Sequence, residues 1–226
     1  MSRHALSEKR PFLLASIAAA VAYFFLRDAE FPEIVAVLVK GAAVALLAAY
    51  AWQRHSAPDV KTIAWVLGIG ALGDIAVEYD QEIGGLLFFL GHLIAISLYW
   101  RHRRAAPTQT QKAAAVALLI LTPAIAYLLP ADRAEAQSVA LYALVLGGMA
   151  ASAWASDFPR YRVGVGALLF VVSDLLIFAG MGPLAASPLP HWLVWPIYYT
   201  GQFLICIGVM QSLRKRDPEL RIVSSR

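Results

Sequence analysis

Two aspartates, Asp74 and Asp174, lie inside runs of residues that otherwise have the composition of a membrane interior. A lone carboxylate in hydrocarbon costs roughly a few kcal/mol or more unless it is paired or hydrated, so such residues are functional candidates. Burial favours the protonated form of a carboxyl group and a nearby cation favours the ionised form, so two aspartates can differ in protonation near neutral pH. One acid and one base are what hydrolysis of an acetal-like bond requires. The pair therefore predicts acid/base hydrolysis, with structural hydrogen bonding as the alternative.

Other polar side chains are predicted to lie with the aspartates in the outer half of the bilayer. Counted along the predicted helices, Lys40, Asp74 and Asp174 lie about 8–11 Å from the outer helix ends, and His92 about 12 Å. A water-accessible pocket that opens outward would explain this common level. The six predicted pocket residues are Lys40, Glu78, His92, Ser173, Tyr198 and Gln202.

Several of these residues have a structural interpretation as well. Lys40 either neutralises a carboxylate in a buried ion pair or takes part in the chemistry. His92 is either an interhelical hydrogen-bond donor or a catalyst. Glu78, one turn beyond Asp74, is interpreted as solvated at the outer interface. Ser173 is expected to serve packing or hydrogen bonding rather than to act as a nucleophile.

A metal or other cofactor is not expected. Cys206 is the only cysteine, which excludes an intramolecular disulfide and a cysteine-cluster metal site. His92 is the single histidine predicted to lie inside the membrane, which argues against a three-histidine zinc site.

The elements that must position these residues are transmembrane helices. The chain has 226 residues, of which 60% are hydrophobic and 15% charged, against roughly 25% charged in an ordinary soluble domain. Apolar runs long enough to span a bilayer predict an all-α membrane protein with eight transmembrane helices in one domain, residues 1–226. The predicted helices are about 11–26, 34–52, 62–78, 84–100, 113–129, 138–156, 163–180 and 191–213.

The distribution of positive charge predicts the orientation of these helices. Sixteen of the nineteen Lys and Arg residues fall in the N-terminal segment, the second, fourth and sixth loops and the C-terminal segment. Since positive charge collects in cytoplasmic loops, both termini are predicted to be cytoplasmic, as in a bacterial inner-membrane protein. The basic residues then face lipid headgroups rather than nucleic acid. Trp192 and Trp195 are expected at the outer interface.

The chain also contains an internal similarity between helices four apart. The segments that match are Phe88–Ile96 with Tyr198–Cys206, Leu72–Val77 with Val172–Ile177, and more weakly Leu38–Ala42 with Leu144–Gly148. The matches predict two parallel four-helix halves. In such an arrangement Asp74 and His92 of one half face Asp174 and Gln202 of the other.

At these residues the sequence resembles the YhhN-like membrane proteins, which include the lysoplasmalogenases. The resemblance covers about residues 34–210 and is carried by Lys40, Gly73-Asp74, Gly91-His92, Gly166–Ile177 and Tyr198–Ile205. It implies an eight-helix hydrolase that cleaves the vinyl ether of a lysoplasmalogen, a lysophospholipid, into a fatty aldehyde and a glycerophospho-alcohol without a metal. Carried onto this chain, Asp74 and Asp174 are the catalytic pair. Lys40, His92, Tyr198 and Gln202 support the pocket.

The residues leave other functions open. A lipid-binding protein or a small proton-coupled carrier could also use intramembrane charges and parallel repeats. A carrier should continue its polar track into the cytoplasmic half of the helices, where this sequence has almost no ionisable residues, so an enzyme pocket open on one side is favoured. A hydrolase of lipid esters or amides is the third option. In the favoured mechanism Asp174 is the acid and Asp74, expected near Lys40, is the base.

Overall fold

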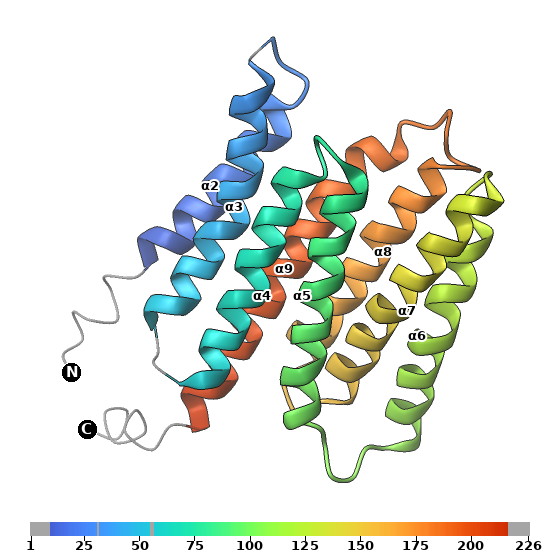
Figure 1. Ribbon diagram of the computed structural model, residues 1–226. Coiled ribbons are helices and arrows are strands. Elements are labelled where there is room, and N and C mark those ends of the chain that lie inside the picture. Colours follow the sequence, from blue (N-terminus) through green and yellow to red (C-terminus); the bar gives the residue numbers. More distant parts are fainter. Residues whose placement is uncertain (1–9, 31, 55–56, 217–226) are drawn as a thin grey trace. The chain divides into compact units, whose positions relative to one another are not determined.

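The computed structural model describes residues 10–30, 32–54 and 57–216. In this part of the chain the regular structure is helical and no strand occurs, which confirms the all-α prediction. The elements, labelled in Figure 1, are α2 (Arg10–Leu26), α3 (Glu33–Arg54), α4 (Pro58–Ala76), α5 (Gln81–Arg101), α6 (Gln109–Leu128), α7 (Arg133–Ala155), the π-helical turn η1 (Arg160–Gly164), α8 (Val165–Gly180) and α9 (Leu189–Arg216).

Six helical segments among the described residues are long and apolar enough to cross a membrane. They are α3, α5, α6, α7, η1 with α8, and α9. Helix α2 is apolar but shorter. Helix α4 has 19 residues but carries three charges, Asp59, Lys61 and Asp74. The chain is therefore a multi-pass helical membrane protein.

The helices begin earlier than the apolar segments predicted, because their first turns are polar and capped. In α6, Thr108 and Gln111 form a reciprocal capping box. In α7, the Asp132 carboxylate accepts a hydrogen bond of 2.8 Å from the Ala134 N–H. Hydropathy marks only the apolar part of each helix, so these polar starts were outside the predicted segments.

The end of α4 differs from the prediction in a way that matters for the site. The helix ends at Ala76 rather than 78, so Asp74 lies in its last turn and Glu78 lies in the turn that follows. The Asp80 carboxylate accepts hydrogen bonds from the N–H groups of Glu82 and Ile83 and so fixes the start of α5. Asp74 is about 3 Å along the axis from the end of α4 rather than 8–11 Å.

The chain forms two compact units, Met1–Ile94 and Ala95–Arg226, called here the N-terminal and C-terminal units. In the N-terminal unit, α3 packs against both α2 and α4. Ser16 on α2 donates a hydrogen bond of 2.5 Å to the Ala43 carbonyl on α3. A Cβ on Gly84 would lie 2.7 Å from the Val77 Cα. The turn between α4 and α5 therefore depends on a residue without a side chain.

The C-terminal unit contains the last residues of α5 and all later helices. Its main pairs are α6 with α7 and α8 with α9, and Figure 1 shows α6, α7 and α8 side by side. A Cβ on Gly166 would lie 2.7 Å from the Gly201 carbonyl oxygen, and one on Gly201 would lie 2.8 Å from the Gly166 carbonyl oxygen. Backbone thus meets backbone where α8 crosses α9, as expected for membrane helices that associate through small residues.

This crossing gives a first testable prediction. Gly201→Ala will lower the stability of the protein by about 1–3 kcal/mol, because the new methyl group meets backbone that cannot rotate away. The matched control is Gly68→Ala in α4, where no atom lies within 4 Å of the added Cβ. The control should leave stability unchanged or raise it by about 0.5–1 kcal/mol. Thermal unfolding in detergent measures both, and equal effects at the two glycines would argue against the crossing.

Candidate active site

Asp174 is buried in α8 and is held by hydroxyl groups. The residue is only 6% exposed. The Tyr142 hydroxyl on α7 donates a hydrogen bond of 2.7 Å to Oδ2 of Asp174. The Tyr142 ring lies edge-on to Phe178, with 6.0 Å between ring centroids. Packing on the same helix that carries the aspartate therefore fixes the phenol that contacts it.

Ser173 lies on the other side of the Asp174 carboxyl group. The Ser173 Oγ is 3.2 Å from Oδ1 of Asp174 and 2.7 Å from the Phe170 carbonyl oxygen. A hydroxyl group has one proton, and the shorter distance assigns that proton to the Phe170 carbonyl. Ser173 is therefore a hydrogen-bonding residue, as its sequence context suggests, in contact with both the Phe170 carbonyl and the Asp174 carboxyl group.

Helix α9 contributes Tyr198 and Gln202, both buried. The Gln202 Nε2 donates to the Tyr198 hydroxyl at 3.2 Å. The Tyr198 ring packs edge-on against Phe170, with 5.1 Å between centroids. Phe170 thus links the two helices, because its carbonyl accepts from Ser173 while its ring contacts Tyr198. The structure brings together the four candidate residues of this unit, Ser173, Asp174, Tyr198 and Gln202.

Trp195 is packed among other side chains of the protein, whereas Trp192 is exposed. It is 5% exposed, whereas Trp192 is 48% exposed. Its ring lies 5.8 Å from that of Tyr198 and stacks on Tyr199 at 6.0 Å. Its side chain thus packs on two tyrosines of the same helix, and its interfacial position stays a prediction.

In the N-terminal unit, Lys40 forms an ion pair with Glu78. The Lys40 Nζ on α3 contacts Oε1 of Glu78 just beyond the end of α4. The two side chains are 12% and 32% exposed. A Cβ on Gly41 would lie 2.5 Å from Cγ1 of Ile75, so this glycine lets α3 approach the end of α4. The interpretation of Glu78 as merely solvated is wrong, because its carboxylate faces a cation on the neighbouring helix.

Tyr23 on α2 joins the same polar cluster. Its ring centroid lies 5.7 Å from the Lys40 Nζ, and the residue is 8% exposed. Glu78 and Asp74 are both within electrostatic reach of the Tyr23 hydroxyl. Asp74 itself is 2% exposed. The N-terminal unit therefore gathers one buried carboxyl group, one ion pair and one phenol.

His92 on α5 does not lie beside Asp74 on α4. In the α4–α5 hairpin, Gly84 faces Val77, and a Cβ on Gly73 would lie 3.1 Å from the Phe88 ring. Continued along the antiparallel pair, this register puts His92 roughly five residues, about 7 Å, from the level of Asp74. His92 is 4% exposed. The common level expected for these two residues is thus not observed within this unit.

The Lys40–Glu78 ion pair gives the second testable prediction. Lys40→Met or Glu78→Gln alone leaves one half-buried charge without its partner and will cost about 1–3 kcal/mol. The double variant will cost less than the sum of the two, with a coupling of about 1 kcal/mol. Thermal unfolding of the four proteins measures this cycle, and additive effects would contradict the pairing.

Two residues near the aspartates were not predicted. Tyr142 is the hydrogen-bond donor to Asp174, and Tyr23 belongs to the Lys40 cluster. A tyrosine in the middle of an alanine-rich helix was the available signal for Tyr142. Asp74 and Asp174 belong to different units, and their joint action stays a prediction.

In the described part of the chain, His, Cys, Asp and Glu side chains do not gather in threes that could hold a metal ion. Cys206 is buried and free. Reaction without a metal stays a prediction.

The apolar helices and the buried carboxyl groups define a polytopic α-helical membrane protein with ionisable groups inside its helices. The chain belongs to the YhhN family, whose model matches residues 35–209. This confirms the family resemblance seen in the sequence. No curated protein and no solved structure matches the chain.

Proposed function

We propose that the protein is a membrane lysoplasmalogenase, which hydrolyses the vinyl ether bond of a lysophospholipid to a fatty aldehyde and a glycerophospho-alcohol. Membership of the YhhN family supports this assignment. The observation that carries it is the buried Asp174 carboxyl group between Tyr142 and Ser173. A vinyl ether is cleaved by proton transfer to carbon, and a buried carboxylic acid is a suitable proton donor for that step.

The hydrogen-bonding groups around Asp174 can accommodate a protonated carboxyl group. Ser173 donates to the Phe170 carbonyl at 2.7 Å, and its Oγ lies 3.2 Å from Oδ1 of Asp174. In the proposed acid Oδ1 carries the proton, and Asp174 would donate across this second contact. Tyr142 donates to the remaining oxygen, Oδ2. Every hydroxyl proton in this series of hydrogen bonds then has one acceptor, and the Asp174 carboxyl group carries no charge. This is the arrangement that a general acid needs before its substrate binds.

The proposed reaction uses Asp174 as acid and Asp74 as base. Asp174 transfers its proton to the ether-distal vinyl carbon, which leaves an oxocarbenium ion on the carbon attached to oxygen. Water adds to that carbon and gives a proton to Asp74. The product of this addition is a hemiacetal. The hemiacetal collapses as Asp74 protonates the leaving glycerol oxygen and Asp174 takes the hydroxyl proton. One water is consumed, and both carboxyl groups return to their starting forms.

The role of Asp74 no longer rests on a direct pairing with Lys40. The Lys40 ammonium contacts Glu78, and Asp74 lies in the same polar region at the end of α4. Lys40, Glu78, Tyr23 and His92 are proposed to position Asp74 and the substrate headgroup rather than to transfer protons.

The predicted internal repeat supports a shared role for the two aspartates. When Asp74 is aligned with Asp174, Val66 aligns with Gly166. In the α4–α5 hairpin, the Val66 carbonyl lies 3.8 Å from a Cβ placed on Gly91. In the α8–α9 hairpin, the Gly166 carbonyl lies 2.8 Å from a Cβ on Gly201, the residue equivalent to Gly91. This matched contact in each hairpin is what two copies of one motif would give, and it supports the proposed repeat.

We also propose that the chain spans the bilayer eight times, with α2 and α4 among the spans. In this topology both termini are cytoplasmic, and the membrane is the bacterial inner membrane. The basic loops support this orientation.

The test is aldehyde release by the purified full-length protein. Alkenyl, alkyl and acyl lysophospholipids with the same headgroup are supplied in mixed micelles, and the products are identified by mass spectrometry. We expect aldehyde from the alkenyl lipid and no cleavage of the alkyl or acyl lipid. Fatty acid from the acyl lipid at a comparable rate would favour an ester hydrolase. Binding of the alkenyl lipid without any cleavage would favour the lipid-binding or carrier alternative.

A further inference from the structure

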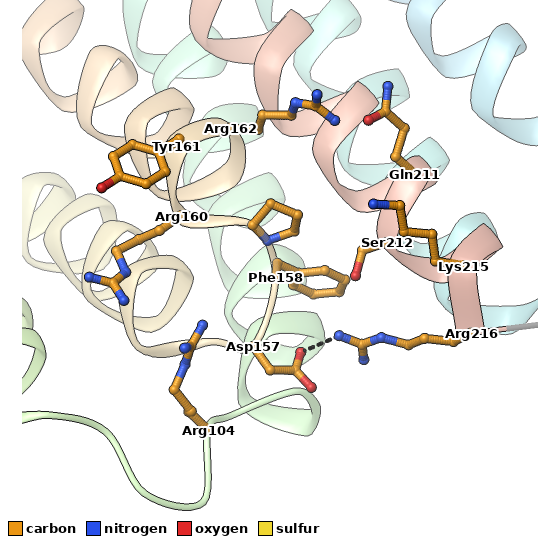
Figure 2. Close-up of a pocket in the computed structure, with 11 residues that line it drawn as sticks. Arg104, Asp157, Phe158, Arg160, Tyr161, Arg162, Gln211, Ser212, Lys215 and Arg216 are labelled. Atoms are coloured by element: carbon orange, nitrogen blue, oxygen red, sulfur yellow. Dashed lines mark ion pairs between the residues drawn. The ribbon is translucent and has the colours of Figure 1, made fainter.

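A basic pocket lies at the end of the C-terminal unit where η1 begins and α9 ends. Its volume is about 460 Å³, and Figure 2 shows the residues around it. Five of the lining residues are cationic and one is acidic: Arg104, Arg160, Arg162, Lys215, Arg216 and Asp157. None of them belongs to the candidate active site. A concave site with this excess of positive charge is suited to an anion.

The one acidic residue is already engaged by one of the cations. Asp157 accepts a contact of 2.8 Å from Nη2 of Arg216, drawn as a dashed line in Figure 2. His102 contacts the Arg216 guanidinium group, with its Nδ1 3.0 Å from Nη1 of Arg216. Asp157, the one acidic residue of the lining, therefore lies against Arg216 and His102, whose Nδ1 is 3.9 Å from Oδ1 of Asp157.

The pocket is built by close helix packing rather than by surface loops alone. A Cβ on Gly208 of α9 would lie 2.8 Å from the Arg162 Cβ and 2.7 Å from Cγ2 of Val163. This approach puts Arg162 next to α9, and Figure 2 shows its side chain extending toward Gln211 and Lys215. Arg162 lies in a π-helical turn, a rare geometry that is frequent at functional sites.

Two further arginines of the pocket, Arg104 and Arg160, are held by contacts with the protein. Arg104 donates through Nε and Nη2 to the Ser156 carbonyl oxygen, at 3.2 and 3.0 Å, which holds its side chain in place. Arg160 lies over the Trp154 ring at 5.9 Å, and its Nε is buried without a hydrogen-bond acceptor among the described residues. A buried donor of this kind is satisfied by a ligand or by water.

The position of the pocket indicates where its ligand comes from. It lies at the ends of membrane-crossing helices, and Tyr161 on its rim is 90% exposed. Exposed tyrosines at helix ends are typical of the headgroup level of a bilayer. Arginine forks match the geometry of phosphate oxygens, and basic pockets between membrane helices are known to bind anionic lipid headgroups.

We propose that this pocket binds the phosphate group of an anionic phospholipid in the surrounding leaflet, at a site separate from the proposed vinyl ether site. Arg162 and Lys215 contact the phosphate from η1 and α9, and Arg104 and Arg160 contribute positive charge from the other side. The lipid joins the start of α8 to the end of α9 and so stabilises the C-terminal unit. This inference does not depend on the enzymatic activity.

The test measures the stabilisation of the full-length protein by lipid. Purified protein in mixed micelles is titrated with phosphatidylglycerol, with phosphatidylcholine or with inorganic phosphate, and the unfolding temperature is recorded. We expect a saturable rise with phosphatidylglycerol alone. In the double variant Arg162→Gln with Lys215→Gln, the apparent affinity for phosphatidylglycerol should fall about tenfold or more, because two charge-assisted contacts are removed.

The matched control is the double variant Lys112→Gln with Arg214→Gln. It removes the same charge from exposed positions that do not line the pocket, and it should keep the wild-type response. Equal loss in both variants, or equal stabilisation by phosphatidylcholine, would overturn the proposed site. Stabilisation by inorganic phosphate that equals the lipid response would overturn the assignment to a lipid. Circular dichroism without added lipid checks that each variant is folded.

Discussion

Asp174→Asn will lower the rate of aldehyde release from an alkenyl lysolipid by about a thousandfold or more. General acid catalysis contributes roughly 10²–10⁴ to a rate, and the amide of Asn cannot donate a proton to carbon at neutral pH. The amide oxygen can still accept the hydrogen bond from Tyr142, and the side chain has nearly the same shape. The variant should therefore fold, and its main defect should be in kcat.

The control for this variant is Glu135→Gln, which removes an exposed carboxylate in the first turn of α7. Its activity should equal that of the wild type. Unfolding temperatures and substrate binding are measured for both variants. Retention of more than about a tenth of wild-type kcat by a folded Asp174→Asn protein would exclude this residue as the acid.

Asp74→Asn is the second variant with a large expected effect, a loss of about 10²–10⁴ in kcat. Without the carboxylate, water is not deprotonated as it adds to the oxocarbenium ion, and the hemiacetal lacks the acid that protonates its leaving oxygen. The residue is 2% exposed, and Asn has nearly the same shape as Asp, so the variant should fold. Steady-state kinetics with the alkenyl lysolipid measure the loss.

Glu82→Gln serves as the control for Asp74→Asn. It removes an exposed carboxylate in the first turn of α5, close in sequence to the end of α4. Unchanged activity is expected. If both variants lose activity to the same degree, general electrostatics at this helix end rather than a base at position 74 would explain the result.

The fold could be predicted from the sequence because hydropathy reports directly on it. Long apolar runs separated by short polar loops leave few alternatives to membrane helices, and the described helices agree with the predicted segments to within about five residues. The differences arise at helix ends. There, capping by Thr108, Asp132 and Asp80 adds polar first turns to α6, α7 and α5, and hydropathy does not register such local hydrogen bonds.

The candidate site was predicted less completely, because residue type does not specify which partner a side chain meets. Ser173, Asp174, Tyr198 and Gln202 were predicted as members of one pocket, and hydrogen bonds link Ser173 to Asp174 and Gln202 to Tyr198 within their own helices. The partners in the contacts between helices were not predicted, since an ion pair of Lys40 was considered but Asp74 rather than Glu78 was expected beside it. Tyr142 reaches Asp174 from α7, and Lys40 meets Glu78 because Gly41 lets two helices approach closely. The π-helical turn at Arg160–Gly164 also has no signal in the hydrophobic pattern.

The central claim is that the reaction begins with proton transfer to carbon. The most direct measurement is turnover of an alkenyl lysolipid in D₂O, with the aldehyde trapped by reduction and analysed by mass spectrometry. The account predicts a single deuterium on the carbon next to the aldehyde carbon, in a product that keeps the full chain length. Full-length aldehyde without that deuterium, or a shortened aldehyde from oxidative cleavage, would contradict it.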